Sequence, residues 1–80
     1  PPRNIVLPLL VGLDGSVSTR KAIQLLSDAG INYRYQEMLN TESKYADMLL
    51  AISGSVEVPQ LLVGGDVYAG NEKIRRYVRN

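Results

Sequence analysis

The sequence contains no cysteine, no histidine and no tryptophan among its 80 residues. Without cysteine and histidine the chain cannot form a disulfide, a structural zinc site, an iron–sulfur cluster or a Ser-His or Cys-His nucleophile. We therefore expect no metal site and no resident cofactor. The lack of cysteine does not identify the redox compartment, because a cysteine-free domain is equally stable inside and outside cells.

A strong charge of one sign and long apolar runs are also missing. Nine Lys and Arg against eight Asp and Glu give a formal net charge of +1, which argues against a polybasic nucleic-acid binder. The cations near the C-terminal end complement the dipole of a helix, and no aromatic residue stands among them to stack on bases. The apolar runs are far shorter than the ~20 residues needed to span a bilayer. We expect a soluble cytoplasmic protein, with an organellar location left open, that binds neither nucleic acid nor membrane.

The chain length limits the size of any ligand site. Eighty residues allow one compact domain, so we treat residues 1–80 as a single unit. A chain of this size buries only about 60 to 65% of the surface that its unfolded form exposes. A ligand site is therefore expected to be a surface groove.

The first half of the chain predicts a strand, a helix and a second strand. Residues 5–11 are an apolar run that predicts a buried strand, in which Pro8 must lie where no neighbour needs its amide. Residues 16–30 have helical spacing of apolar side chains, with Ser16 or Ser18 as N-cap and Gly30 as C-cap. Ile31 is expected to complete a Schellman motif. The alternation over 31–36 predicts a half-buried strand in which the tyrosines pack in the core or at its rim.

The second half predicts a helix, a hairpin and a last helix. Asn40 or Thr41 can cap the second helix, which stops at Ser53-Gly54. Its predicted apolar face consists of Tyr45, Met48, Leu49 and Ile52. Residues 60–63 and 67–69 flank a glycine-rich turn and predict an antiparallel hairpin. Asn71 is expected to cap the third helix, whose inward residues are Ile74, Tyr77 and Val78.

This β-α-β-α-β-β-α order predicts an α/β fold with a four-stranded mixed sheet between helices. The first strand is expected to be central, between strands two and three. Because β-α-β crossovers are right-handed in ~98% of cases, helices one and three should cover one face and helix two the other.

Two segments have features suited to ligand binding. The loop over residues 14–19 leads into the first helix, whose free amides and dipole can stabilise an anion. On that observation alone, plain capping by Ser16 or Ser18 is the stronger interpretation. The proline of Val58-Pro59 stands just before a predicted core strand, and we predict that this peptide is cis, which leaves the backbone groups of Val58 free.

Residues 58–65 read VPQLLVGG and resemble the Thr-Val-Pro-Gln-Val-Phe-Ile-Gly-Gly segment of glutaredoxins, which belong to the thioredoxin superfamily. Residues 69–72, AGNE, stand where that family has Gly-Gly-Cys-Asp or Gly-Gly-Ser-Asp. Residues 20–35 resemble the helix and strand that follow the family's Cys-Pro-Tyr-Cys. The resemblance covers nearly the whole chain and implies the glutaredoxin-type thioredoxin fold.

The resemblance also implies where a site would lie and shows how this chain departs from the family. The positions of the family's two cysteines are Ser16 and Thr19, so the motif reads Ser-Val-Ser-Thr and thiol–disulfide exchange is not expected. No lysine precedes the motif, where Leu13 and Asp14 stand. The implied ligand-binding residues are Val17, Ser18, Val58, Pro59, Asn71 and Glu72, with glutathione or a protein as the partner.

Several functions remain open at this point. One is a redox-inactive domain that binds glutathione or a protein thiol, and another is a cysteine-substituted form of a glutathione-dependent disulfide oxidoreductase. A third is the amino-terminal domain of a glutathione transferase, in which Ser16 would hydrogen-bond the glutathione sulfur. In that family too a Val-Pro pair precedes a strand, as at Val58-Pro59. The fourth is a non-catalytic protein-interaction module.

Overall fold

The computed structural model describes residues 7–38, 44–55 and 57–79, in seven elements. These are β1 (Leu9–Gly12), α1 (Val17–Asp28), β2 (Arg34–Glu37), α2 (Lys44–Ser53), β3 (Gln60–Val63), β4 (Asp66–Ala69) and α3 (Asn71–Arg79). The predicted β-α-β-α-β-β-α order is confirmed.

The strands form one mixed sheet in the order β2-β1-β3-β4. β1 runs parallel to β2 and antiparallel to β3, so that Leu10 stands opposite Tyr35 on one side and Leu61 on the other. β3 and β4 form the antiparallel hairpin expected from the glycine turn. The prediction that the first strand is central is therefore confirmed.

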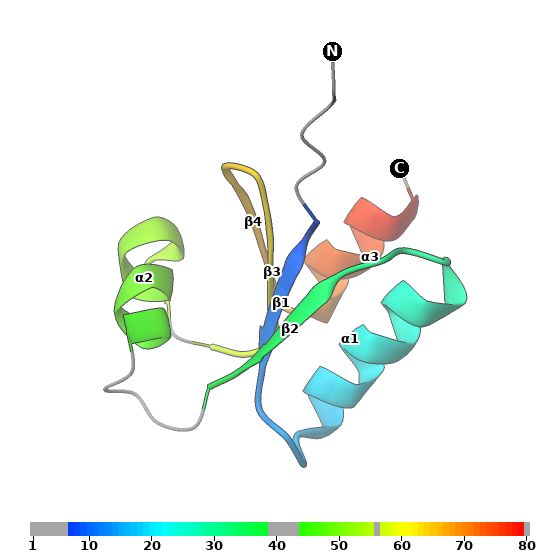
Figure 1. Ribbon diagram of the computed structural model, residues 1–80, viewed down its shortest axis with the longest axis horizontal. Helices are drawn as coiled ribbons and strands as arrows, with labels where there is room; N and C mark the ends of the chain where they lie inside the picture. The colour runs from blue at the N-terminus through cyan, green and yellow to red at the C-terminus, as the bar shows by residue number, and fades with distance from the viewer. Residues whose placement is uncertain (1–6, 39–43, 56, 80) are drawn as a thin grey trace.

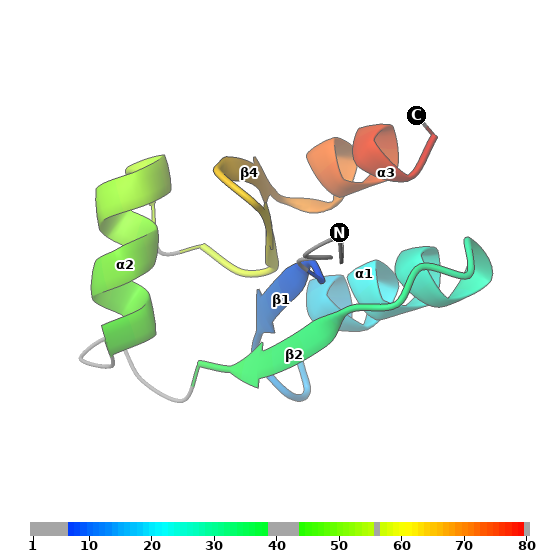
Figure 2. The same cartoon turned by 45° about the horizontal axis from the view of Figure 1, so that its top comes forward.

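The two faces of the sheet are covered by different helices, as Figures 1 and 2 show: α1 and α3 lie on one face and α2 on the other. Successive strand residues point to opposite faces, so neighbours on β1 enter different clusters. Leu10 packs with Ala22, Leu26, Leu61 and Ile74, and Val11 packs with Met38, Ala46 and Leu49. None of the described helices is long and apolar enough to cross a bilayer.

β1 is shorter than the predicted strand because it begins only after Pro8. The Pro8 carbonyl accepts a hydrogen bond from the Arg34 amide at 2.8 Å, while its own nitrogen has no proton to contribute. Residues 5 and 6 of the predicted strand lie outside the described part. β2 begins at Arg34 rather than at 31 because its partner in the ladder, Leu9, is the first residue of β1.

Local capping signals set the ends of α1. Ser16 is the N-cap, and its side chain accepts a hydrogen bond from the Thr19 amide. At the other end Gly30 has φ +70°. The Ile31 amide donates to the Leu26 carbonyl and the Gly30 amide to the Ser27 carbonyl, which is the predicted Schellman motif.

Two predictions about the later helices are wrong. Of the α2 residues whose burial the structure describes, Ala46 and Leu49 are buried, so the predicted Leu49 is confirmed, whereas the predicted Ile52 is 51% exposed. The stop at Gly54 is confirmed by its φ of +77°, and the predicted caps Asn40 and Thr41 lie outside the described residues. Asn71 does not cap α3: the helix begins at Asn71, and the Ile74 amide bonds to the Gly70 carbonyl.

Candidate ligand-binding site

The start of α1 is held by Ser16 and leaves backbone amides free. The Ser16 Oγ accepts the Thr19 amide at 3.3 Å and lies 3.2 Å from the Ser18 Oγ. The Ser16 carbonyl accepts the first intrahelical bond, from Arg20. In the described part of the chain the amides of Val17 and Ser18 have no partner, as expected for the first turn of a helix. Ser16 therefore performs the predicted capping role, and the two amides after it are available to a ligand.

Thr19, the second cysteine position implied by the resemblance, points into the molecule. It is 2% exposed, and its Oγ1 accepts the Leu13 amide at 3.1 Å. That bond holds the loop after β1 against the first turn of α1. Ser16 and Thr19 thus have different surroundings: one caps the surface end of the helix, and the other is buried against the sheet.

The segment before β3 provides a second set of free backbone groups. The Val58-Pro59 peptide is cis, as predicted. Neither the amide nor the carbonyl of Val58 has a hydrogen-bond partner among the residues described. The preceding loop is held by the buried Gln60 side chain, whose Nε2 donates to the Ser55 and Glu57 carbonyls at 2.9 and 2.8 Å. Gln60 was not among the predicted site residues.

The start of α3 lies beside both of these segments. The Asn71 Nδ2 donates to the Ser18 carbonyl at 2.9 Å, and the Gly70 amide donates to the Pro59 carbonyl, also at 2.9 Å. The amides of Asn71 and Glu72 precede the first intrahelical bond and have no other partner in the described ranges. The Glu72 carboxylate accepts from Arg76 on the helix surface. The contribution of Glu72 to a site is therefore its backbone amide.

Together these groups form what we call the amide edge: the free backbone groups of Val17, Ser18, Val58, Asn71 and Glu72. Two helix N-termini meet there, each with a partial positive charge of about half an elementary charge. Beside the start of α3 stands the unpaired backbone of Val58, with one donor and one acceptor. Such an arrangement suits a ligand with carboxylates and a peptide main chain.

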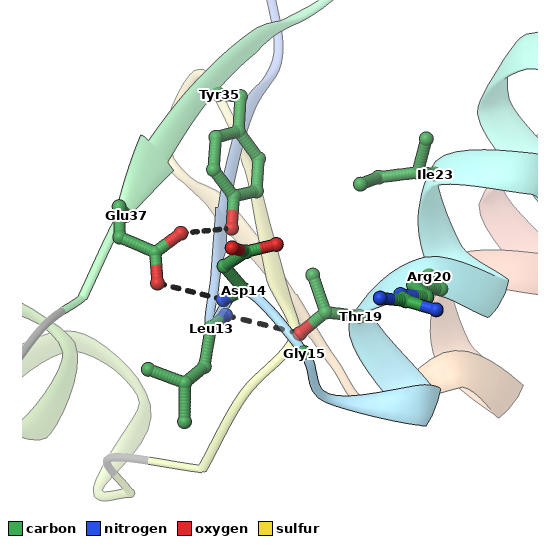
Figure 3. A pocket seen from close by; sticks show the side chains of 8 residues that line it. All are labelled: Leu13, Asp14, Gly15, Thr19, Arg20, Ile23, Tyr35 and Glu37. Carbon is green, nitrogen blue, oxygen red and sulfur yellow. Dashed lines mark hydrogen bonds between the residues drawn. The ribbon is translucent and has the colours of Figure 1, made fainter.

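A second polar group lies on the β2 side of the loop after β1 and was missed by the sequence analysis (Figure 3). The Glu37 carboxylate accepts the Tyr35 hydroxyl at 2.7 Å and the Asp14 amide at 2.6 Å. These two hydrogen bonds hold the pKa of Glu37 below its usual value. Burial, followed by the Glu37 bond and charge, raises the pKa of Tyr35. The signal that could have revealed the group is the parallel pairing, because the carboxyl ends of β1 and β2 must meet at one edge.

The described residues contain no group of three or more acidic side chains placed to hold a metal ion.

No protein-family model matches the chain, and no curated protein sequence matches it. Solved structures do. A glutaredoxin from Archaeoglobus fulgidus matches 96% of this chain and 90% of its own length with a TM-score of 0.76 at 22% identity. An oxidised glutaredoxin from Chlamydomonas reinhardtii matches 91% of this chain and 71% of its own length, with a TM-score of 0.71 and also at 22% identity. The chain has a glutaredoxin-like fold.

A glutathione S-transferase from Xanthobacter autotrophicus is as similar in structure to this chain as the Archaeoglobus glutaredoxin is, with a TM-score of 0.76 at 20% identity. The match covers 91% of this chain and 37% of the transferase chain. At these identities the similarity establishes the fold. The chain thus has the fold that these glutaredoxins and this transferase share, and it contains no cysteine.

Proposed function

We propose that this chain is a glutathione-binding domain of the thioredoxin fold that carries out no thiol–disulfide exchange. The observation that carries the proposal is the amide edge, where the starts of α1 and α3 and the unpaired Val58 backbone lie together. Glutathione offers a peptide main chain and two carboxylates, which match the free groups of the amide edge, and a thiol, which matches the Ser16 hydroxyl at the start of α1.

The Val58 backbone is the element that selects a peptide. Its amide and carbonyl have no partner in the described part of the chain, and an extended segment can pair with them as a strand pairs with a sheet edge. The loop that carries Val58 is fixed by the two Gln60 hydrogen bonds. Because the loop is already ordered, binding loses little conformational entropy.

The two helix starts account for the charged ends of the ligand. Free amides at Val17 and Ser18 and at Asn71 and Glu72 favour anions at each end of the edge. The bond from Asn71 to the Ser18 carbonyl fixes the spacing between the two helix starts. The names of the structural neighbours, glutaredoxin and glutathione S-transferase, support a glutathione ligand over other small peptides.

The chemistry at Ser16 is limited. A hydroxyl cannot replace sulfur in disulfide exchange, but it can donate to the sulfur of a bound thiol. The start of α1 provides ~0.3 to 1 kcal/mol for a thiolate, and a hydroxyl donor adds about 1.5 kcal/mol. At 1.36 kcal/mol per pKa unit, these lower a thiol pKa of about 8.5 by at most about two units. We therefore expect binding with modest activation of the thiol.

The test removes one amide of the edge without removing the helix. Val17 is the first residue of α1 and is 68% exposed, and proline is well tolerated at this position. Ser16 has φ −75° and ψ 128°, which suits a residue that precedes proline. Val17→Pro therefore deletes one N–H group, and Val17→Ala is the matched control that deletes only the side chain.

Binding is measured by following amide chemical shifts of the labelled protein while reduced glutathione is added. The wild type and Val17→Ala should bind alike, with shifts at Ser18, Val58, Asn71 and Glu72. Val17→Pro should bind about fivefold more weakly or worse, the cost of one lost hydrogen bond. If glutathione leaves these amides unmoved in the wild type, the proposal is wrong, and a protein-interaction role becomes the better one.

The transferase-like alternative depends on Ser16. It is examined by recording thiolate absorbance of bound glutathione against pH, with Ser16→Ala as the control. A bound thiol pKa clearly below about 6.5 that returns toward 8.5 in the variant would favour that alternative.

A further inference from the structure

A pocket of about 350 Å³ lies beside the first turn of α1, outside the amide edge. Its walls come from the loop after β1, from α1 and from β2, as Figure 3 shows. The volume is within the range of about 300 to 1,000 Å³ that small-molecule sites occupy. The pocket is therefore large enough for a ligand of its own.

The pocket and the amide edge are on different sides of β1. Gly12 at the end of β1 stands opposite Glu37 of β2, which lines the pocket. On the other side Val11 stands opposite Gln60 of β3, two residues after Val58. The buried Thr19 of the first turn of α1 forms part of the pocket wall. A ligand in the pocket would consequently contact β2, whereas a ligand at the amide edge would contact the segment before β3.

The strand side of the pocket is built by hydrogen bonds. Glu37 is fixed by the Tyr35 hydroxyl and by the Asp14 amide, so the Tyr35 ring and the loop residue Asp14 have set positions. Figure 3 shows the Asp14 carboxylate on the same side of the pocket as Tyr35, close enough for its charge to act on the hydroxyl, and Ile23 and Arg20 of α1 on the other side. The pocket thus has an acidic strand side and a basic helix side.

The charges on the two sides are unpaired. Neither the Asp14 carboxylate nor the Arg20 guanidinium has a hydrogen-bond or ion-pair partner in the described ranges. Between them the lining is apolar: Ile23 is half-buried, and Leu13 and Tyr35 are 40% and 39% exposed. An apolar floor with one free group of each sign is complementary to a ligand that carries both charges on an apolar body.

We propose that this pocket binds a free α-amino acid with an aromatic or large aliphatic side chain. The ligand's ammonium group contacts the Asp14 carboxylate, its carboxylate contacts the Arg20 guanidinium, and its side chain lies between Ile23 and the Tyr35 ring. A simple anion is disfavoured by the two carboxylates of the strand side, and a simple cation leaves the Arg20 guanidinium without a partner. The inference does not depend on the glutathione proposal.

The probe is L-phenylalanine, added to the labelled full chain while amide shifts are recorded. Shifts are expected at Leu13, Gly15, Ile23 and Tyr35, with a dissociation constant in roughly the millimolar range for a ligand of this size. Phenethylamine lacks the carboxylate and 3-phenylpropanoate lacks the ammonium group, and each should bind at least fivefold more weakly. Equal binding of all three compounds, or shifts confined to the amide edge, would overturn the proposal.

Two variants test the charges, one in the loop after β1 and one on α1, with control variants on α1. Arg20→Gln and Asp14→Asn should each weaken phenylalanine binding at least fivefold. Lys21→Gln and Asp28→Asn make the same charge changes at residues outside the pocket. Each should change the affinity for phenylalanine less than twofold. Because all four positions are exposed, the fold is expected to persist, which the unperturbed amide spectrum verifies. An unchanged affinity in Arg20→Gln contradicts the proposal, and so does one in Asp14→Asn.

Discussion

Gly12, at the end of β1, has no room for a side chain, and its replacement by alanine should destabilise the protein. A Cβ atom at this position would overlap the Thr19 Cγ2 and stand 3.0 Å from the Thr19 Oγ1 and 3.2 Å from the Tyr35 Cε1. Thr19 cannot easily give way, because it is 2% exposed and its Oγ1 holds the Leu13 amide. The cost therefore falls on the packing between β1 and α1.

The magnitude follows from three contributions. Overpacking a buried position costs about 1 to 3 kcal/mol, and weakening the bond between Thr19 and Leu13 costs about 1 kcal/mol more. Against this, replacing glycine with alanine lowers the entropy of the unfolded chain and stabilises by about 0.4 to 1 kcal/mol. We expect a net loss of about 1 to 3.6 kcal/mol, out of a total stability of roughly 4 to 12 kcal/mol for 80 residues.

Urea denaturation of the single and double variants tests the cause as well as the size of the loss. Thr19→Ser removes the Cγ2 atom but keeps the hydroxyl, so alone it should cost about 1 kcal/mol. In the Gly12→Ala background the same change should be neutral or stabilising, which gives a coupling energy of about 1 to 2 kcal/mol. If the two losses instead add to within about 0.5 kcal/mol, the overlap with Thr19 is not the cause and the reasoning fails.

Three further predictions concern individual hydrogen bonds. Gln60→Met should lower the free energy of unfolding by about 2 kcal/mol, because two loop carbonyls lose their donor; a loss below about 0.5 kcal/mol in urea denaturation would contradict this. Ser16→Ala should cost about 1 kcal/mol and Ser16→Asp almost nothing, since aspartate also caps; equal thermal midpoints for the two would argue against capping. Tyr35→Phe should raise the lowered pKa of Glu37 toward 4.5. Because a lowered folded-state pKa stabilises above the unfolded value, the wild type should lose more stability than Tyr35→Phe as the pH falls from 5 to 3. Carboxyl carbon shifts and denaturation at each pH measure both effects, and identical pH profiles would refute them.

The parts of the fold set by local chemistry could be predicted from the sequence. Ser16 and Gly30 cap α1 through local interactions that do not depend on the rest of the fold. The Ser16 side chain accepts a hydrogen bond from an amide of the first turn, and Gly30 adopts the positive φ that ends the helix. The hairpin follows from its two glycines for the same reason. The strand order and the helix faces follow from the handedness of crossovers and from the alternation of apolar residues.

The parts decided by contacts distant in sequence could not be predicted. The spacing in α2 fits two apolar faces that share Leu49, and packing against the sheet buries the one with Ala46 rather than the one with Ile52. Asn71 is a residue type that often caps helices, yet its side-chain amide donates to the Ser18 carbonyl at the start of α1. Glu37 lies one residue beyond the predicted strand, and its role depends on the loop after β1.

The most direct measurement of the central claim is a set of nuclear Overhauser effects between bound glutathione and the labelled protein. The account predicts contacts from the cysteinyl Hα of the ligand to the backbone protons of Val58, together with contacts to the amides of Val17 and Ser18. Contacts only to the pocket side chains Ile23 and Tyr35, or none at saturating glutathione, would contradict binding at the amide edge.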